Sequence, residues 1–277
     1  MSSQPVPKPS FLKAFFGLYL RDLRVLSREL GPFLLRVGMQ PLLFLFVFTF
    51  VMPHMAGGSP MMMAAPGGAG AAGFGTVLLP GLMAVAIMFS GIAAVALPLS
   101  SEFGITREID DRVMCPVPVW AVALEKVCFS ALQSIVAALL VIPMAILIPA
   151  KAVYPDVHNW LLFVLVLVMS SLLAGALGLA IGSVVPPKNI GLIFSIIVVP
   201  ITFLGCVYYP WAGLEKIHWL QMAVLFNPIV YISEGLRASV TPGVEHMPVW
   251  AILGALTVFL VILGRFGVRG FMRRVIS

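Results

Sequence analysis

Long apolar runs alternate with short polar segments along most of this chain. A bilayer core of about 30 Å requires roughly 20 consecutive apolar residues in a helix, so uncharged runs of that length predict membrane spans. Six runs meet this description, and Pro143 interrupts the third, which we expect to be tilted or broken. The predicted spans cover residues 33–52, 77–99, 120–149, 160–184, 190–209 and 248–264.

The segment 10–30, before the first span, has a different and amphipathic pattern. Apolar residues recur there at steps of three and four, while Arg21, Arg24 and Arg28 fall on the opposite side. We expect a cytoplasmic interfacial helix whose arginines face lipid phosphate or a protein partner, and simple anchoring explains the pattern equally well. Gly31-Pro32 is expected to turn the chain into the bilayer.

The stretch 210–240 is too polar to cross a bilayer and too apolar for an ordinary loop. Asn227 can cap a helix whose first residue is Pro228. We expect two short helices here that enter the outer leaflet and return between spans five and six. Helix is the backbone form that this depth tolerates without cover from protein or water.

Composition and charge support a membrane protein with a defined orientation. Hydrophobic residues make up 61% of the chain and charged residues 10%, so lipid must cover surface that no soluble core could hide. Lys and Arg near span ends are retained on the cytoplasmic side. With the N-terminus inside, the inner segments hold fourteen bases and the outer segments three. The inner bases are Lys8, Lys13, Arg21, Arg24, Arg28, Arg36, Arg107, Arg112, Lys126, Lys188, Arg265, Arg269, Arg273 and Arg274, and the outer ones are Lys151, Lys216 and Arg237.

We therefore predict an all-α polytopic protein of the bacterial cytoplasmic (inner) membrane, with both ends inside and one transmembrane domain, 1–277. Span four carries a row of small residues at four-residue intervals, which favours close packing within the chain over dimerisation. The row consists of Ser170, Ala174, Gly178 and Gly182.

The residues that carry chemistry argue against an enzyme. The four histidines all fall on predicted outer segments, and none forms a metalloprotease HExxH pair. No GxxxxGK[ST] loop is present to hold nucleotide phosphates, and no Asp or Glu lies in the middle of a span, where ion-coupled carriers keep their coupling sites. We expect no catalytic residue, no metal site, no cofactor and no nucleic acid partner, but a translocator driven from outside itself.

The segment 100–118 is the most charged stretch in the middle of the chain, and it fits either a docking helix or a solvated loop. It contains Glu102, Phe103-Gly104, Thr106, Glu108-Ile109 and Pro116, and Lys126 follows. These positions resemble the pattern of the membrane subunits of type-2 ABC exporters, which read Glu-x-x-Gly-x-x-x-Glu-apolar, a Pro turn and a lysine, although Glu102 stands two residues before Gly104 where that pattern has three. The segment departs from that pattern at Asp110-Asp111-Arg112, where leucines are common. A second motif lies near the end of the chain and consists of Asn227-Pro228, Tyr231, Glu234 and Arg237. It resembles a motif of permeases of the daunorubicin-efflux and Nod-factor-export type.

The resemblance implies a complex of two membrane subunits, most simply a homodimer, with two nucleotide-binding ATPase subunits that hold ATP and Mg. It implies export of an amphipathic or hydrophobic substrate such as a drug, lipid or small glycolipid. A polysaccharide or lipid-linked glycan exporter, an ion-coupled secondary carrier and an intramembrane enzyme are the alternatives. The implied ATPase contacts are Glu102, Phe103, Gly104, Thr106, Arg107, Glu108, Asp110, Asp111 and Arg112, with Arg21, Arg24 and Arg28 on the interfacial helix, and the implied outer gate is Asn227, Pro228, Tyr231, Glu234 and Arg237.

Overall fold

The computed structural model describes residues 11–51, 74–106, 118–147 and 156–276, and all regular structure within these ranges is helical. This confirms the predicted all-α class. Four of the described helices are long and apolar enough to cross a membrane, and two apolar helices are shorter. The long helices are α5 (Phe74–Ser101), α7 (Val119–Leu147), α8 (Trp160–Val184) and α12 (Val249–Ile276), and the shorter ones are α2 (Leu30–Leu45) and α9 (Ile190–Phe203). The count of six spans stays a prediction.

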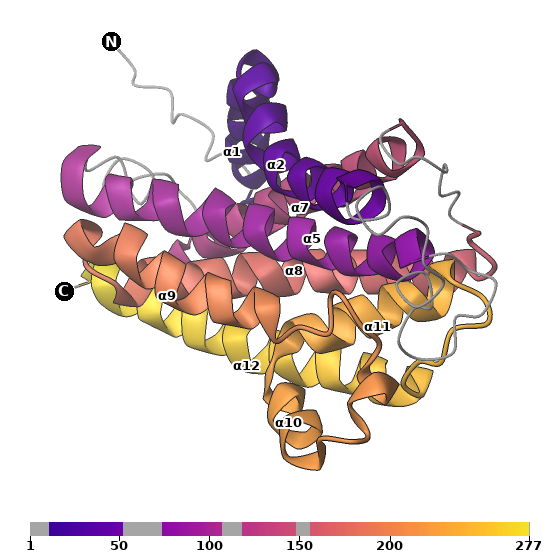
Figure 1. Cartoon of the computed structure of the whole chain (residues 1–277). Coiled ribbons are helices and arrows are strands. Elements are labelled where there is room, and N and C mark those ends of the chain that lie inside the picture. Colours follow the sequence, from indigo (N-terminus) through magenta and orange to yellow (C-terminus); the bar gives the residue numbers. More distant parts are fainter. Residues whose placement is uncertain (1–10, 52–73, 107–117, 148–155, 277) are drawn as a thin grey trace, which may run out of the picture.

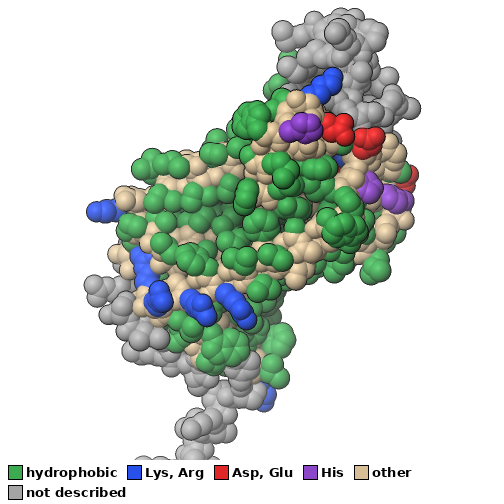
Figure 2. Space-filling model, turned by 90° about the horizontal axis from the view of Figure 1, so that it is seen from below, with side chains coloured by type: hydrophobic (Ala, Val, Ile, Leu, Met, Phe, Trp, Pro, Cys, Tyr) green, Lys and Arg blue, Asp and Glu red, His purple; other side chains and the backbone are tan. Residues whose placement is uncertain are grey.

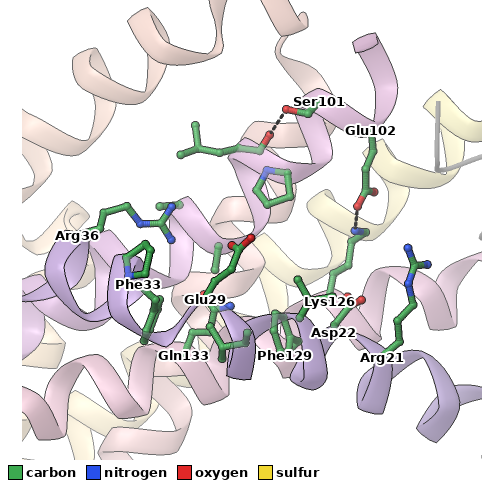
Figure 3. A pocket seen from close by; sticks show the side chains of 17 residues that line it. Arg21, Asp22, Glu29, Phe33, Arg36, Ser101, Glu102, Lys126, Phe129 and Gln133 are labelled. Atoms are coloured by element: carbon green, nitrogen blue, oxygen red, sulfur yellow. Dashed lines mark hydrogen bonds and ion pairs between the residues drawn. The ribbon is translucent and has the colours of Figure 1, made fainter. Parts of the chain in front are cut away.

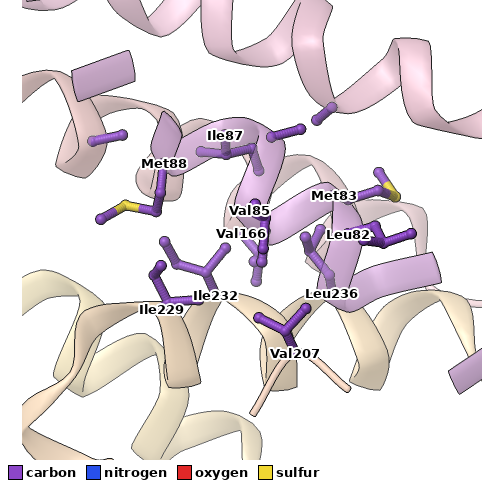
Figure 4. Close-up of a cluster of buried hydrophobic side chains, with 14 of the residues drawn as sticks. Leu82, Met83, Val85, Ile87, Met88, Val166, Val207, Ile229, Ile232 and Leu236 are labelled. Carbon is purple, nitrogen blue, oxygen red and sulfur yellow. The ribbon is translucent and has the colours of Figure 1, made fainter. Parts of the chain in front are cut away.

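Helix α5 forms the centre of the bundle, where it lies against α7, α8 and the short helix α11 (Pro228–Val240) (Figure 1). In its most apolar window 78% of the residues are buried, against 17% in that of α12, which lies at the periphery. Figure 4 shows the packed side chains at the centre, where α5 meets α8, α11 and the turn at Val207. Those labelled are Leu82, Met83, Val85, Ile87, Met88, Val166, Val207, Ile229, Ile232 and Leu236.

The row of small residues on α8 lies against α5 within the same chain. A Cβ atom added at Gly178 would stand 2.8 Å from the carbonyl oxygen of Ile92, and one added at Gly182 would stand 3.1 Å from Cα of Ala96. Ser170 and Ala174 are fully buried on the same side. Only small residues allow two helix backbones to approach this closely.

The N-terminal helices α1 (Phe11–Arg28) and α2 are separated by a bend at Glu29. The prediction that Gly31-Pro32 turns the chain is wrong, because Pro32 lies in the first turn of α2, where a helix needs no amide hydrogen. Helix α1 crosses the long helices steeply, and α2 continues into a π-helical turn, η1 (Phe46–Val51) (Figure 1).

Helix α9 ends at Phe203, before the predicted end of span five at residue 209. The chain leaves the helix there because Pro200 weakens its last turns and Cys206 adopts a positive φ of 51°. Three short helices follow before α11: η4 (Trp211–Leu214), α10 (His218–Ala223) and η5 (Val224–Phe226). Asn227 accepts a hydrogen bond from the amide of Ile229 and Pro228 opens α11, which confirms the predicted cap.

Helix α12 continues to Ile276, past the predicted end of span six at residue 264. Arginines end the apolar run there, but they are good helix formers and can extend their charge toward water. Figure 2 shows apolar side chains across this face of the molecule, with most of the visible basic side chains at one end and the acidic side chains and histidines at the other. A cytoplasmic and an outer end would differ in this way, and the N-in orientation stays a prediction.

Candidate functional site

Two helix ends that flank the charged segment 107–117 are joined by a buried ion pair. Nζ of Lys126, in the second turn of α7, donates to Oε1 of Glu102 at 2.7 Å, and the two side chains are only 7% and 8% exposed. Glu102 is the first residue of the π-helical segment η2 (Glu102–Thr106), which continues α5. A charge-assisted hydrogen bond in a poorly hydrated place is strong, so the pair holds the ends of α5 and α7 together.

Phe103, the next residue, joins the same place to the end of α12. Its ring centroid lies 6.0 Å from that of Phe271, and Cζ of Arg274 lies 4.4 Å from it, over the ring face. Nη1 of Arg274 also donates to the carbonyl oxygens of Gly182, Ser183 and Val185 at 3.1, 3.2 and 2.9 Å. Arg274 thereby caps the C-terminus of α8, where free carbonyls favour a cation.

Gly104 brings a further connection into this cluster. A Cβ atom added there would stand 2.5 Å from Cγ of Pro187, in the turn η3 (Pro187–Asn189) between α8 and α9. We call the whole cluster the inner junction. It consists of Glu102, Phe103, Gly104, Lys126, Pro187, Phe271 and Arg274.

Three of the predicted ATPase contacts, Glu102, Phe103 and Gly104, therefore meet in the inner junction. Thr106 ends η2. The other residues predicted in the segment lie outside the described part of the chain; they are Arg107, Glu108, Asp110, Asp111 and Arg112. Sequence reasoning missed Phe271 and Arg274, because they follow the predicted end of the last span, and a helix that continues through arginines would have been the signal.

A cavity of about 650 Å³ opens beside the inner junction, between α1, α2, α5 and α7 (Figure 3). Arg21 lines it together with Glu102 and Lys126, whereas Arg24 and Arg28 are exposed on α1 away from it. We call this space the amphipathic cavity because charged and apolar side chains both line it. The lining residues are Arg21, Asp22, Val25, Leu26, Glu29, Pro32, Phe33, Arg36, Ala93, Ala94, Leu97, Pro98, Ser101, Glu102, Lys126, Phe129 and Gln133.

The predicted gate residues form a second buried ion pair, the outer ion pair, at the opposite end of the bundle. Glu234 and Arg237 are fully buried on α11, and Nη1 of Arg237 donates to Oε1 of Glu234. The carboxylate also accepts the amide N–H groups of Trp211 and Met247, each at 3.0 Å. Nη2 of Arg237 donates to the carbonyl oxygen of Cys206 at 3.1 Å, so the pair ties α11 to the chain on both sides of it.

The other predicted gate residues attach α11 to the end of α9 and to η5. Nδ2 of Asn227 donates to the carbonyl oxygen of Ile201 at 2.6 Å, and the hydroxyl of Tyr231 donates to that of Leu225 at 3.0 Å. With Pro228 at its start, α11 thus carries all five predicted residues. The structure brings them together, and their role as a gate stays a prediction.

A model of the family described as ABC-2 type transporter matches residues 14–241 of this chain, from α1 to the end of α11. The chain belongs to this family. The ABC-2 match spans both the inner junction up to Pro187 and the outer ion pair. With its several apolar helices, this ABC-2 family member is a multi-pass membrane transport permease.

Among curated proteins, the chain is similar to the inner membrane transport permease YadH of Escherichia coli K12. The two are 29% identical over 188 residues, which cover 66% of this chain and 69% of YadH. YadH of Escherichia coli O157:H7 and of Shigella flexneri match with the same figures. No solved structure matches this ABC-2 chain.

Proposed function

We propose that this chain is the membrane subunit of an ATP-driven exporter, which moves an amphipathic or hydrophobic substrate such as a drug, lipid or small glycolipid out of the cytoplasm. The chain is a multi-pass protein of the bacterial inner membrane, as its family and its similarity to YadH indicate. The observation that carries the proposal is the inner junction, because it joins the helix ends on either side of the charged segment 107–117.

The inner junction supplies a physical route for coupling. A force applied to the segment after η2 acts on α5 directly and on α7 through the Glu102–Lys126 bond. The same force reaches α12 and the end of α8 through Phe103 and Arg274. A closing ATPase dimer that bound this segment would therefore move four helix ends together.

The complex that fits this role contains two copies of the chain and two nucleotide-binding subunits, which hold ATP and Mg. Six spans with both ends inside place the inner junction, α1 and the segment 107–117 on the cytoplasmic side. The short helices α10 and α11 then enter the outer leaflet and return. In this arrangement Asn227, Pro228, Tyr231, Glu234 and Arg237 form the outer gate.

The test is to purify the chain with a soluble P-loop ATPase encoded beside it and to measure assembly, ATP hydrolysis and transport. The double variant Glu102→Gln/Gly104→Ala should lose the ATPase subunit or uncouple hydrolysis from transport, while the membrane fold survives in thermal unfolding. Glu215→Gln, an exposed carboxylate after η4, is the control. Unchanged assembly and transport in the double variant would reject the docking role of the inner junction.

The same preparation separates the alternatives. A drug, lipid or glycolipid exporter should hydrolyse ATP faster when those compounds are added, whereas a polysaccharide exporter should respond to lipid-linked glycans. A secondary carrier would transport without the ATPase subunit and would stop when the ion gradient is collapsed.

A further inference from the structure

The amphipathic cavity carries a cation and an anion that the described part of the protein leaves unpaired. The side chains of Arg36 on α2 and Glu29 at the α1–α2 bend form no hydrogen bond or ion pair within the described residues. Both line the cavity. In Figure 3 their charged ends lie on one side of it, while Glu102, Lys126 and Arg21 lie on the other.

Gln133 of α7 adds an unused acceptor to the same wall. Its side chain lines the cavity, the residue is only 7% exposed, and its Oε1 accepts no hydrogen bond from the described residues. A buried amide oxygen without a donor is unfavourable and calls for a ligand group that supplies one.

The polar lining as a whole is balanced in charge. Three cations and three anions line the cavity, so a molecule that carries both signs gains more there than an ion of one sign. Arginine matches phosphate, to which its planar fork can donate two hydrogen bonds. Glu29 and Gln133 both accept, and they therefore match a cation that has N–H donors. The charged residues are Arg21, Arg36 and Lys126 against Asp22, Glu29 and Glu102.

Most of the remaining lining is apolar, as a site for a molecule with acyl chains requires. Leu26 and Phe33 line it from α1 and α2, and Leu97 and Phe129 line it from α5 and α7. Other apolar side chains of α1, including Phe16, are exposed on the protein surface, as expected for a helix that contacts lipid. A ligand of this cavity can therefore keep its polar group inside and its hydrocarbon near the membrane.

We infer that the amphipathic cavity binds the headgroup of an aminophospholipid of the phosphatidylethanolamine type. Arg36 holds the phosphate, and Glu29 and Gln133 accept hydrogen bonds from the primary ammonium. A choline headgroup lacks those N–H donors, and a glycerol headgroup carries no cation to balance the carboxylate of Glu29. This site does not depend on ATP hydrolysis or on the identity of the exported substrate.

The test measures which lipid stays bound to the full-length chain. The chain is reconstituted in nanodiscs of equal parts dioleoyl phosphatidylethanolamine, phosphatidylcholine and phosphatidylglycerol, extracted in detergent, and weighed by native mass spectrometry without nucleotide. We expect phosphatidylethanolamine to be retained about tenfold over the other two, since one charge-assisted hydrogen bond is worth about a factor of ten. Arg36→Gln and Glu29→Gln should each remove this preference.

Matched controls replace charges outside the cavity. Arg265→Gln on α12 and Glu215→Gln after η4 are exposed and do not line it, so both should retain phosphatidylethanolamine as the wild type does. Gln133→Leu should lower the preference for phosphatidylethanolamine over phosphatidylcholine. It should lower the preference for phosphatidylethanolamine over phosphatidylglycerol less.

Equal retention of the three lipids by the wild type would overturn the inference. This measurement uses the wild type alone, so it does not depend on whether a variant folds. Equal losses in Arg36→Gln and Arg265→Gln would overturn the assignment of Arg36. Soluble O-phosphoethanolamine separates the two sources of this headgroup chemistry: we expect weak displacement by it and strong displacement by dihexanoyl phosphatidylethanolamine. If the soluble compound binds while no lipid is retained, the lipid assignment is wrong.

Discussion

The two buried ion pairs of this protein differ in what surrounds them. The outer pair, Glu234 with Arg237, is fully buried, and backbone groups from both sides of α11 add hydrogen bonds to it, while Nε of Arg237 has no partner among the described residues. The inner pair, Glu102 with Lys126, forms one wall of the amphipathic cavity. The same chemistry therefore fixes the outer end, while at the inner end it joins helices beside a space into which side chains can move.

The largest effect should come from breaking the outer pair. Arg237→Met leaves the Glu234 carboxylate buried without its charge partner, and removing one member of a buried pair costs about 3–5 kcal/mol. We expect the variant to lose most of its folded yield, or to unfold at a much lower temperature in detergent. Tryptophan fluorescence on heating checks this.

The double variant Glu234→Met/Arg237→Met tests whether charge is the cause. It buries no unpaired ion and should regain part of the lost stability. The recovery stays incomplete, because the amides of Trp211 and Met247 lose their acceptor. A double variant less stable than Arg237→Met would show that packing, and not charge, makes this region rigid.

A smaller loss of stability is expected at the outer end of the bundle, where α5 passes the turn that follows α9. A Cβ atom at Gly81 would stand 2.0 Å from the carbonyl oxygen of Val207, so Gly81→Ala forces two backbones apart. Overpacking of this kind costs about 1–3 kcal/mol. The control is Gly254→Ala on α12, where nothing lies within 4 Å; it should be neutral or stabilise by about 0.5–1 kcal/mol. Thermal unfolding of the two variants measures the difference.

The sequence predicted the helices wherever apolar length alone decides them. Residues 77–99 and 160–184 fall within α5 and α8, because a long uncharged run has no better structure in lipid. The predicted span ends were wrong for α9 and α12. The first ends early because Cys206 and its neighbours turn back to bond with α11, and the second runs on because arginines favour helix without being apolar.

The sequence predicted which residues belong to the candidate site, but it did not predict the contacts that these residues make. Glu234 and Arg237 were predicted from the family resemblance, yet the N–H groups that bind the Glu234 carboxylate belong to the backbone of Trp211 and Met247, and a backbone donor leaves no mark in sequence. The sequence did not predict Gln133 as a site residue, for a different reason. A single amide in an apolar run acquires meaning only when the cavity beside it is known.

At the inner end, the pair itself can be measured with a double-mutant cycle. Lys126→Met and Glu102→Gln are made singly and together, and their free energies of unfolding are compared. We expect a coupling of about 1.5–3 kcal/mol, the usual range for a hydrogen bond to a charged group. A coupling near zero would mean that packing, and not the ion pair, holds the helix ends of α5 and α7 together. Only the outer ion pair would then contribute to stability.

The smallest effect should come from the ring that joins the inner junction to α12. Phe103→Leu keeps an apolar side chain but removes the face over which Arg274 lies, and a cation–π contact is worth about 0.5–1 kcal/mol at a partly exposed site. Arg274 keeps its three carbonyl partners on α8, so stability should fall only slightly. If the contact transmits motion, the ratio of transport to ATP hydrolysis should fall further than stability does. Phe226→Leu, which is highly exposed, is the matched control, and an equal change in both variants would remove Phe103 from the coupling route.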